Sequence, residues 1–174
     1  KGDSKAVADA LSPNSSTNRI AELQSKGFDT DKLRSAYVAD LASESAYLEF
    51  NNSDNDPIIA AKINGINEAL GFFGVNRLSD SQIANLKLNP DALRGDESGY
   101  YAALFKDEMT GGYILANRGT ENLRDVVTDL RNNFGIVDAQ FEQATDLALA
   151  LAESDIGASV IFTGHLLGGA LASA

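Results

Sequence analysis

A chain of 174 residues is about one domain long, and its hydrophobic content of 44% is enough for a packed core and excludes wholesale disorder. The net charge of −11 argues against nucleic acid and against electrostatic docking on an anionic membrane, because both need a basic face. The absence of cysteine excludes disulfides and thiolate metal sites, and no apolar run approaches the ~20 residues that span a bilayer.

The first part of the chain carries helix patterns. Residues 1–17 are polar and rich in serine and asparagine, which predicts a poorly ordered arm or a short helix followed by a loop. Apolar residues at helical spacing predict a helix over 30–50, which Thr30 can cap. The acidic stretch 51–57 lacks the spacing and the glycine of a calcium loop, so it is interpreted as a helix-capping turn.

Two further helices are expected before the middle of the chain. Pro57 stands at a first helical turn, and the apolar spacing after it predicts a helix that Gly71 caps. Ser79 and Gln82 have the spacing of a capping box, which predicts a short helix to about Leu88.

The pattern changes after residue 99. Two β-rich runs, 100–105 and 113–117, flank a turn sequence and predict a hairpin. Helices are expected over 122–130 and 139–153, and a short buried strand over 158–162. Helices, then a hairpin, then helix, strand and helix predict an α/β fold with an N-terminal helical layer.

The most informative segment follows that last strand. Gly164 and Gly168 flank Leu166 in the pattern of a nucleophile elbow, where G-x-S-x-G forms a sharp turn from a strand into a helix. Leu166 stands where the attacking serine belongs. A leucine side chain has no proton to lose and no lone pair, so it cannot attack a carbonyl carbon.

The chain resembles class 3 (triacylglycerol-type) lipases of the α/β-hydrolase fold. Residues 164–172 match their motif G-H-S-L-G-G-A-L-A at every position except Leu166. Residues 113–120 look like the family strand that ends in Arg-Gly-Ser/Thr, and 125–130 resemble the D-W-x-x-D-L that follows, with valine in place of the tryptophan. A weaker likeness covers 137–144.

The resemblance implies a partial α/β-hydrolase sheet, truncated after the nucleophile elbow. We expect residues 1–174 to form a single incomplete domain, with a helical N-terminal layer over 1–98 and the hairpin, helices and elbow over 99–174. In this fold the triad acid and histidine follow the nucleophile along the chain. The chain supplies neither, so a C-terminal half or a second chain is expected to provide them.

The resemblance also assigns roles within the chain. The amide of Leu167 and the amide or hydroxyl of Thr120 would hold the oxyanion. Thr120 could also cap the next helix, and the two roles are compatible, with the oxyanion role favoured. His165 is the sole histidine, and it adjoins the nucleophile position, so its side chain should point away from the reaction; it is interpreted as structural. The structural elbow comprises Gly164, His165, Gly168 and Gly169.

Two groups of residues admit more than one interpretation. Leu166 is an engineered inactivation, a natural loss or a sequence error, and its intact flanks favour a recent or artificial change over long-standing loss. Arg118 is expected to tie the strand end to a carboxylate such as Asp125 or Asp129. Those two acids could together bind a metal, but are better read as facing Arg124 or Arg131 and solvent.

The function implied by the resemblance is that of a lipase or carboxylic ester hydrolase acting on acylglycerols, phospholipids or related esters through a Ser-His-Asp mechanism. With Leu166 in place of serine, this form is expected to be inactive. The alternatives are a non-catalytic lipid-binding protein and a fragment completed by a second chain. No cofactor, metal or nucleic-acid partner is expected, and family habit suggests secretion.

Overall fold

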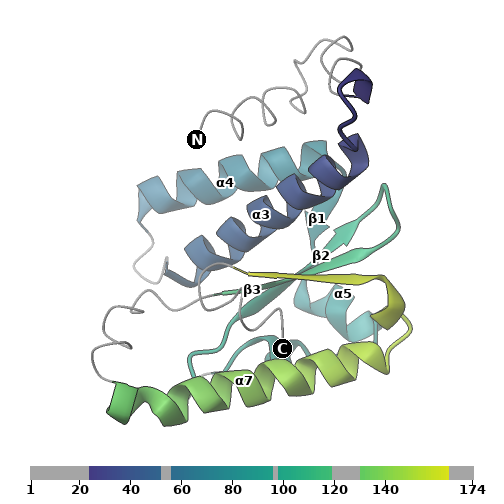
Figure 1. The fold of residues 1–174 in the computed structure, drawn as a ribbon. Coiled ribbons are helices and arrows are strands. Elements are labelled where there is room, and N and C mark those ends of the chain that lie inside the picture. The colour runs from purple at the N-terminus through teal and green to yellow at the C-terminus, as the bar shows by residue number, and fades with distance from the viewer. Residues whose placement is uncertain (1–23, 52–55, 96–97, 119–129, 165–174) are drawn as a thin grey trace.

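The computed structural model describes residues 24–51, 56–95, 98–118 and 130–164. Its centre is a four-stranded mixed sheet in the order β1-β2-β3-β4 (Figure 1). The strands are β1 (Val75–Arg77), β2 (Ala102–Asp107), β3 (Tyr113–Asn117) and β4 (Val160–Gly164). The β1–β2 and β2–β3 pairs are antiparallel, and β3 and β4 are parallel.

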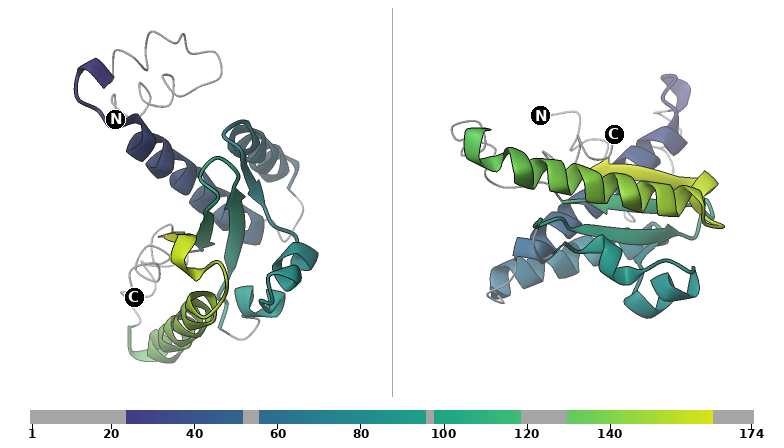
Figure 2. Two further views of the ribbon diagram at one scale, coloured as in Figure 1. Left: turned by 90° about the vertical axis from the view of Figure 1, so that its right-hand side faces the viewer. Right: turned by 90° about the horizontal axis from the view of Figure 1, so that it is seen from below.

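Helices cover both faces of this sheet (Figure 1, Figure 2). The helices are α3 (Thr30–Asn51), α4 (Pro57–Phe72), α5 (Asp80–Asn85) and α7 (Leu130–Ala152), with 3-10 turns η1 (Pro90–Leu93) and η2 (Gly157–Ser159). One buried cluster joins α3 and α4 to one face, and a second joins α5, η1 and α7 to the other. The fold is therefore mixed α/β in three layers, as the order of the predicted elements indicates.

The alternation of side chains along β2 and β3 produces these two cores. Successive residues of a strand point to opposite faces. Leu104 and Leu115 accordingly pack toward α7, whereas Phe105 and Ile114 pack toward α3 and α4, and all four are at most 2% exposed. The hairpin predicted from residues 100–117 is confirmed by the β2–β3 pairing.

Helix caps differ from two expectations. Thr30 does not cap α3: Asp29 Oδ1 accepts the Asp31 and Lys32 amides at 3.2 and 3.1 Å, while the Thr30 hydroxyl accepts from the Gln24 side chain. Gly71 lies inside α4, and the left-handed residue after that helix is Gly74, with φ +71°. The expected capping turn before Pro57 is confirmed, because Asp56 accepts the Ile58 amide at 2.8 Å.

Several boundaries also differ. The helix expected over 139–153 begins at Leu130, and the capping-box helix ends at Asn85, because Lys87 turns the chain with φ 62°. Strand β1 was not predicted from the sequence. The predictions for residues 1–17 and for 122–129 lie outside the described residues.

Strand β4 is shifted and more exposed than the buried strand expected over 158–162. Ile161 and Phe162 are 50% and 36% exposed. Within the described ranges β4 pairs with β3 alone and forms one edge of the sheet. The chain between β3 and β4 contains α7. An edge strand is covered on one side only, which explains its exposure.

Candidate functional site

The carboxyl ends of β3 and β4 define the candidate site. The two strands are parallel, and their register places Asn117 opposite Gly164, so both strands finish at the same end of the sheet. In open α/β sheets, ligands bind in the crevice beyond the carboxyl ends of parallel strands. The segments that follow Asn117 and Gly164 therefore leave the sheet from the edge where ligands are expected.

Of the site residues predicted from the sequence, Gly164 is described, as the last residue of β4. The other members of the elbow and the oxyanion residues lie outside the described residues: Thr120, His165, Leu166, Leu167, Gly168 and Gly169. Asp125 and Asp129 also lie outside them. The roles assigned to these residues stay predictions.

A buried polar pair supports the end of β3. The Tyr100 hydroxyl donates a 2.6 Å hydrogen bond to Asn117 Oδ1, and the two residues are 2% and 1% exposed. Burial raises the pKa of Tyr100 above its ordinary value of 10, so the hydroxyl keeps its proton at ordinary pH. The pair thus provides a neutral, buried hydrogen bond at the end of β3.

Arg118, the residue after Asn117, also holds the end of β3 in place. Its backbone amide donates to the Tyr101 carbonyl at 2.8 Å, and its Nη1 donates to the Gly99 carbonyl at 3.2 Å. The carboxylates expected as its partners lie outside the described residues. In the described structure the guanidinium fastens the end of β3 to the segment that leads into β2.

That segment is fastened in turn to α7. Gln140 Nε2 donates to the Ser98 carbonyl at 2.7 Å, and the Ser98 hydroxyl donates to Gln143 Oε1 at 2.8 Å. Gln140 is 3% exposed, so its hydrogen bond is protected from water. Hydrogen bonds therefore connect helix α7, the segment before β2 and the carboxyl end of β3 in one polar network.

Sequence reasoning missed the Tyr100–Asn117 pair. A usable signal was present, because Asn117 directly follows the apolar run 113–116 and shares a sheet face with Leu115, which predicts burial. A buried amide requires a hydrogen-bond partner. The partner itself could not be named without the register of β2 against β3.

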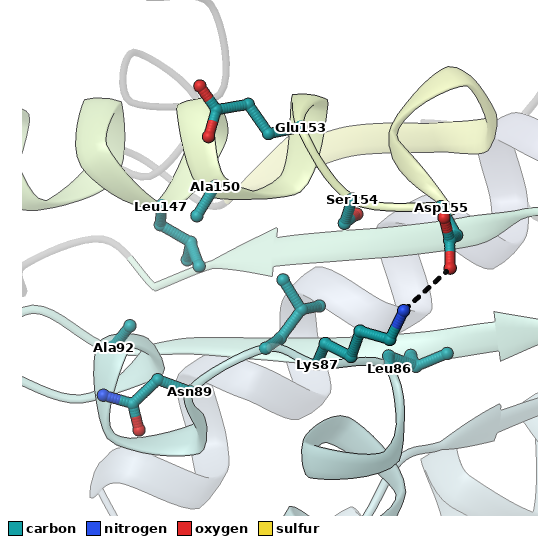
Figure 3. Close-up of a pocket in the computed structure, with 10 residues that line it drawn as sticks. Leu86, Lys87, Asn89, Ala92, Leu147, Ala150, Glu153, Ser154 and Asp155 are labelled. Atoms are coloured by element: carbon teal, nitrogen blue, oxygen red, sulfur yellow. Dashed lines mark ion pairs between the residues drawn. The ribbon is translucent and has the colours of Figure 1, made fainter.

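Two cavities lined by described residues lie away from this edge. One, of about 460 Å³, lies between the α5–η1 segment and the C-terminal end of α7 (Figure 3). Lys87 Nζ and Asp155 Oδ2 form a 3.9 Å ion pair at its rim. The other, of about 300 Å³, is lined by residues at the amino ends of β3 and β4, such as Tyr113 and Val160.

The described residues contain no group of three histidine, cysteine, aspartate or glutamate side chains arranged to hold a metal ion. Within the same ranges, no helix has the length and apolar character needed to cross a membrane.

Comparison with known proteins supplies the family. Residues 42–174 match the phospholipase-like family described as a Tle-like phospholipase domain. The chain is 35% identical over 103 residues to the extracellular phospholipase A1 of Serratia liquefaciens, an alignment covering 59% of this chain and 31% of that protein. The chain thus spans about a third of the length of this curated relative. No solved structure matches significantly. Because the family match extends over most of its length, the chain belongs to the phospholipase-like family with a Tle-like phospholipase domain.

Proposed function

We propose that this chain carries the nucleophile-bearing part of a lipid ester hydrolase of the α/β-hydrolase fold, related to class 3 lipases. The observation that carries the proposal is the pairing of Asn117 with Gly164 at the carboxyl edge of parallel β3 and β4. The Arg-Gly-Thr segment follows the first strand, and the elbow sequence follows the second. The two segments proposed to stabilise the oxyanion and to bear the nucleophile therefore start side by side.

Covalent geometry limits how far these segments can separate. Consecutive Cα atoms are about 3.8 Å apart, so the Cα of Thr120 is within about 11 Å of that of Asn117. By the same bound, the Cα of Leu166 is within about 8 Å of that of Gly164. These limits are compatible with one shared site.

The proposed mechanism is acyl transfer. A serine hydroxyl at position 166 would attack the acyl carbonyl carbon, while a histidine from outside residues 1–174 takes its proton and then gives it to the departing alcohol. Water would later cleave the acyl-enzyme. The Leu167 amide and Thr120 would hold the oxyanion, a kind of donor whose removal typically costs about 10²–10³ in rate. With Leu166 present, no covalent intermediate can form by this route.

The proposed substrates are phospholipids and related acyl esters. The family description names a phospholipase domain, and the relative is named a phospholipase A1. We also propose that residues 1–174 form one incomplete domain, with the catalytic acid and histidine supplied by another segment or chain. Proteins of this family that keep the serine would then hydrolyse lipid esters with the same strand ends.

The test is Leu166→Ser in the full-length protein, with Leu166→Ala as the matched control. The assay measures fatty acid released from phosphatidylcholine vesicles and from a p-nitrophenyl ester. We expect release from Leu166→Ser alone, because the change restores a hydroxyl and nothing else. A folded Leu166→Ser protein that releases no fatty acid would contradict the proposal.

Leu166 itself favours one alternative, a lipid-binding protein without catalysis. That function would be supported if Leu166→Ser stays inactive while the Leu166 protein sediments with the same vesicles.

A further inference from the structure

We propose that Tyr100 is a positioning residue for the candidate site, and that its hydrogen bond to Asn117 fixes the carboxyl end of β3, against which Gly164 of β4 is paired. This inference rests on the proposed function, since it concerns how the oxyanion segment and the elbow are held in register.

The location of Asn117 makes this role possible. Asn117 is the last residue of β3, an inner strand, and pairs with Ala102 of β2 on one side and with Gly164 of β4 on the other. Gly164 precedes the elbow, and Asn117 precedes Arg118-Gly119-Thr120. A displacement of Asn117 would therefore be transmitted to both segments at once.

The chemistry of the bond makes it hard to replace. Asn117 is 1% exposed, so water cannot substitute for the Tyr100 hydroxyl at Oδ1. The phenol ring packs in the hydrophobic cluster that contains Leu104, Leu115 and residues of α7. The 2.6 Å bond thus connects a rigid side chain to the last residue of β3.

Neighbouring contacts reinforce the same connection. Three consecutive residues hold the end of β3: Gly99 accepts from the Arg118 guanidinium, Tyr100 donates to Asn117, and Tyr101 accepts from the Arg118 amide. Of these three contacts, the Tyr100 bond is fully buried. Its loss should loosen the strand end without unfolding the sheet.

The experiment compares Tyr100→Phe with two controls in the full-length protein. Tyr113→Phe removes a phenol hydroxyl at the opposite end of β3, where the ring lies 4.0 Å from Lys106 Nζ. Ile83→Val shortens a core side chain on α5, in the same cluster as Tyr100, and lowers stability without touching the strand end. Both controls are expected to leave the carboxyl edge unchanged.

The first measurement is amide hydrogen exchange of residues 115–118 and 161–164. We expect Tyr100→Phe to speed exchange there about tenfold or more, as local opening becomes easier, whereas neither control does so. Unchanged exchange at both strand ends in Tyr100→Phe would overturn the proposal, whatever the activity of the protein.

The second measurement is ester hydrolysis in the Leu166→Ser background. Since a misplacement of about 1 Å can cost 10²-fold in rate, we expect Tyr100→Phe to lower kcat at least tenfold with KM little changed. The double variant Tyr100→Phe/Asn117→Leu, which removes both polar partners, should regain stability but not kcat. A kcat equal to that of Ile83→Val at equal stability would overturn the positioning role.

The two measurements distinguish a failure of the proposed function from a failure of the role proposed for Tyr100. If Leu166→Ser itself is inactive, the proposed function fails and the catalytic half of this inference fails with it. The exchange data then still decide whether Tyr100 orders the carboxyl ends of β3 and β4.

Discussion

At the scale of single residues, a largely buried ion pair joins three elements at the end of the sheet opposite the candidate site. Arg34 Nη1 and Nη2 donate to the two carboxylate oxygens of Asp107 at 2.8 and 2.9 Å, and Nη2 also donates to the Phe73 carbonyl at 2.6 Å. Asp107 further accepts the Met109 and Thr110 amides. The pair thereby connects α3, the end of α4 and the β2–β3 turn.

This environment determines the ionisation of Asp107. Burial acts to raise the pKa of Asp107, but the hydrogen bonds from Arg34 and Thr110 and the charge of Arg34 more than offset it. The pKa of Asp107 is therefore lower in the folded protein than in the unfolded chain. A lowered pKa adds stability above the unfolded pKa of about 3.9, and this stability is lost as the pH falls through the folded pKa.

The variant Asp107→Asn should accordingly lower the free energy of unfolding by about 1–3 kcal/mol at pH 7, because it leaves the partly buried Arg34 charge without a counter-ion. The deficit should shrink as the pH falls below about 4, because the unfolded parent chain then binds a proton at Asp107 while the folded protein does so only at a lower pH. Urea unfolding at pH 7 and pH 3 measures both effects. The control Lys32→Ala breaks an exposed pair with Asp29 and should cost little. A deficit that does not change with pH would contradict the role given to Asp107.

At the scale of elements, the start of α5 shows how local chemistry defines a boundary. Ser79 Oγ accepts the Gln82 amide, and Gln82 Oε1 accepts the Ser79 amide at 2.8 Å, which completes a capping box. Two amides that the helix cannot satisfy internally are thus paired.

We expect Ser79→Ala to destabilise the protein by about 1 kcal/mol, measured as a shift of the urea midpoint at unchanged slope. Ser81→Ala is the control, since its hydroxyl contacts Ser79 Oγ and caps no backbone amide in the described structure. Equal losses in the two variants would mean that the capping box does not stabilise α5.

Elements with local signals could be predicted from the sequence, and elements defined by distant pairing could not. The capping box, the hairpin and helices α3 and α4 depend on residues close together in the chain. By contrast, β1 has three residues and exists because Val75 pairs with Asp107, far along the sequence. The elbow motif was likewise local, whereas the Tyr100–Asn117 support required the register of β2 against β3.

The exposure of β4 could not be predicted for a related reason. The short apolar run from Val160 to Phe162 indicates burial but does not say which neighbours will cover it. Helix caps were off by one to three residues because several polar or glycine residues stand near each end, and only the folded backbone selects among them.

At the scale of the whole molecule, the three layers leave one edge of the sheet uncovered within the described residues. Strand β4 forms this edge and exposes Ile161 and Phe162. An exposed apolar edge strand is a template for pairing with another chain.

We therefore expect the polypeptide of residues 1–174 to self-associate, and Ile161→Lys to weaken this association by placing a charge at the edge. Sedimentation velocity at two protein concentrations measures the effect. Ile58→Lys, at a 69% exposed position on α4, is the matched control and should change little. Association that is equal in the two variants would exclude β4 as its cause.

The most direct measurement for the whole molecule is covalent labelling of the full-length Leu166→Ser protein with a fluorophosphonate, which reacts with activated serine hydroxyls. Peptide mass spectrometry locates the adduct. We expect phosphonylation at position 166 in Leu166→Ser and at no residue in the Leu166 protein. A folded Leu166→Ser protein that stays unlabelled at position 166 would contradict the assignment of this position as the nucleophile site at the carboxyl edge of β3 and β4.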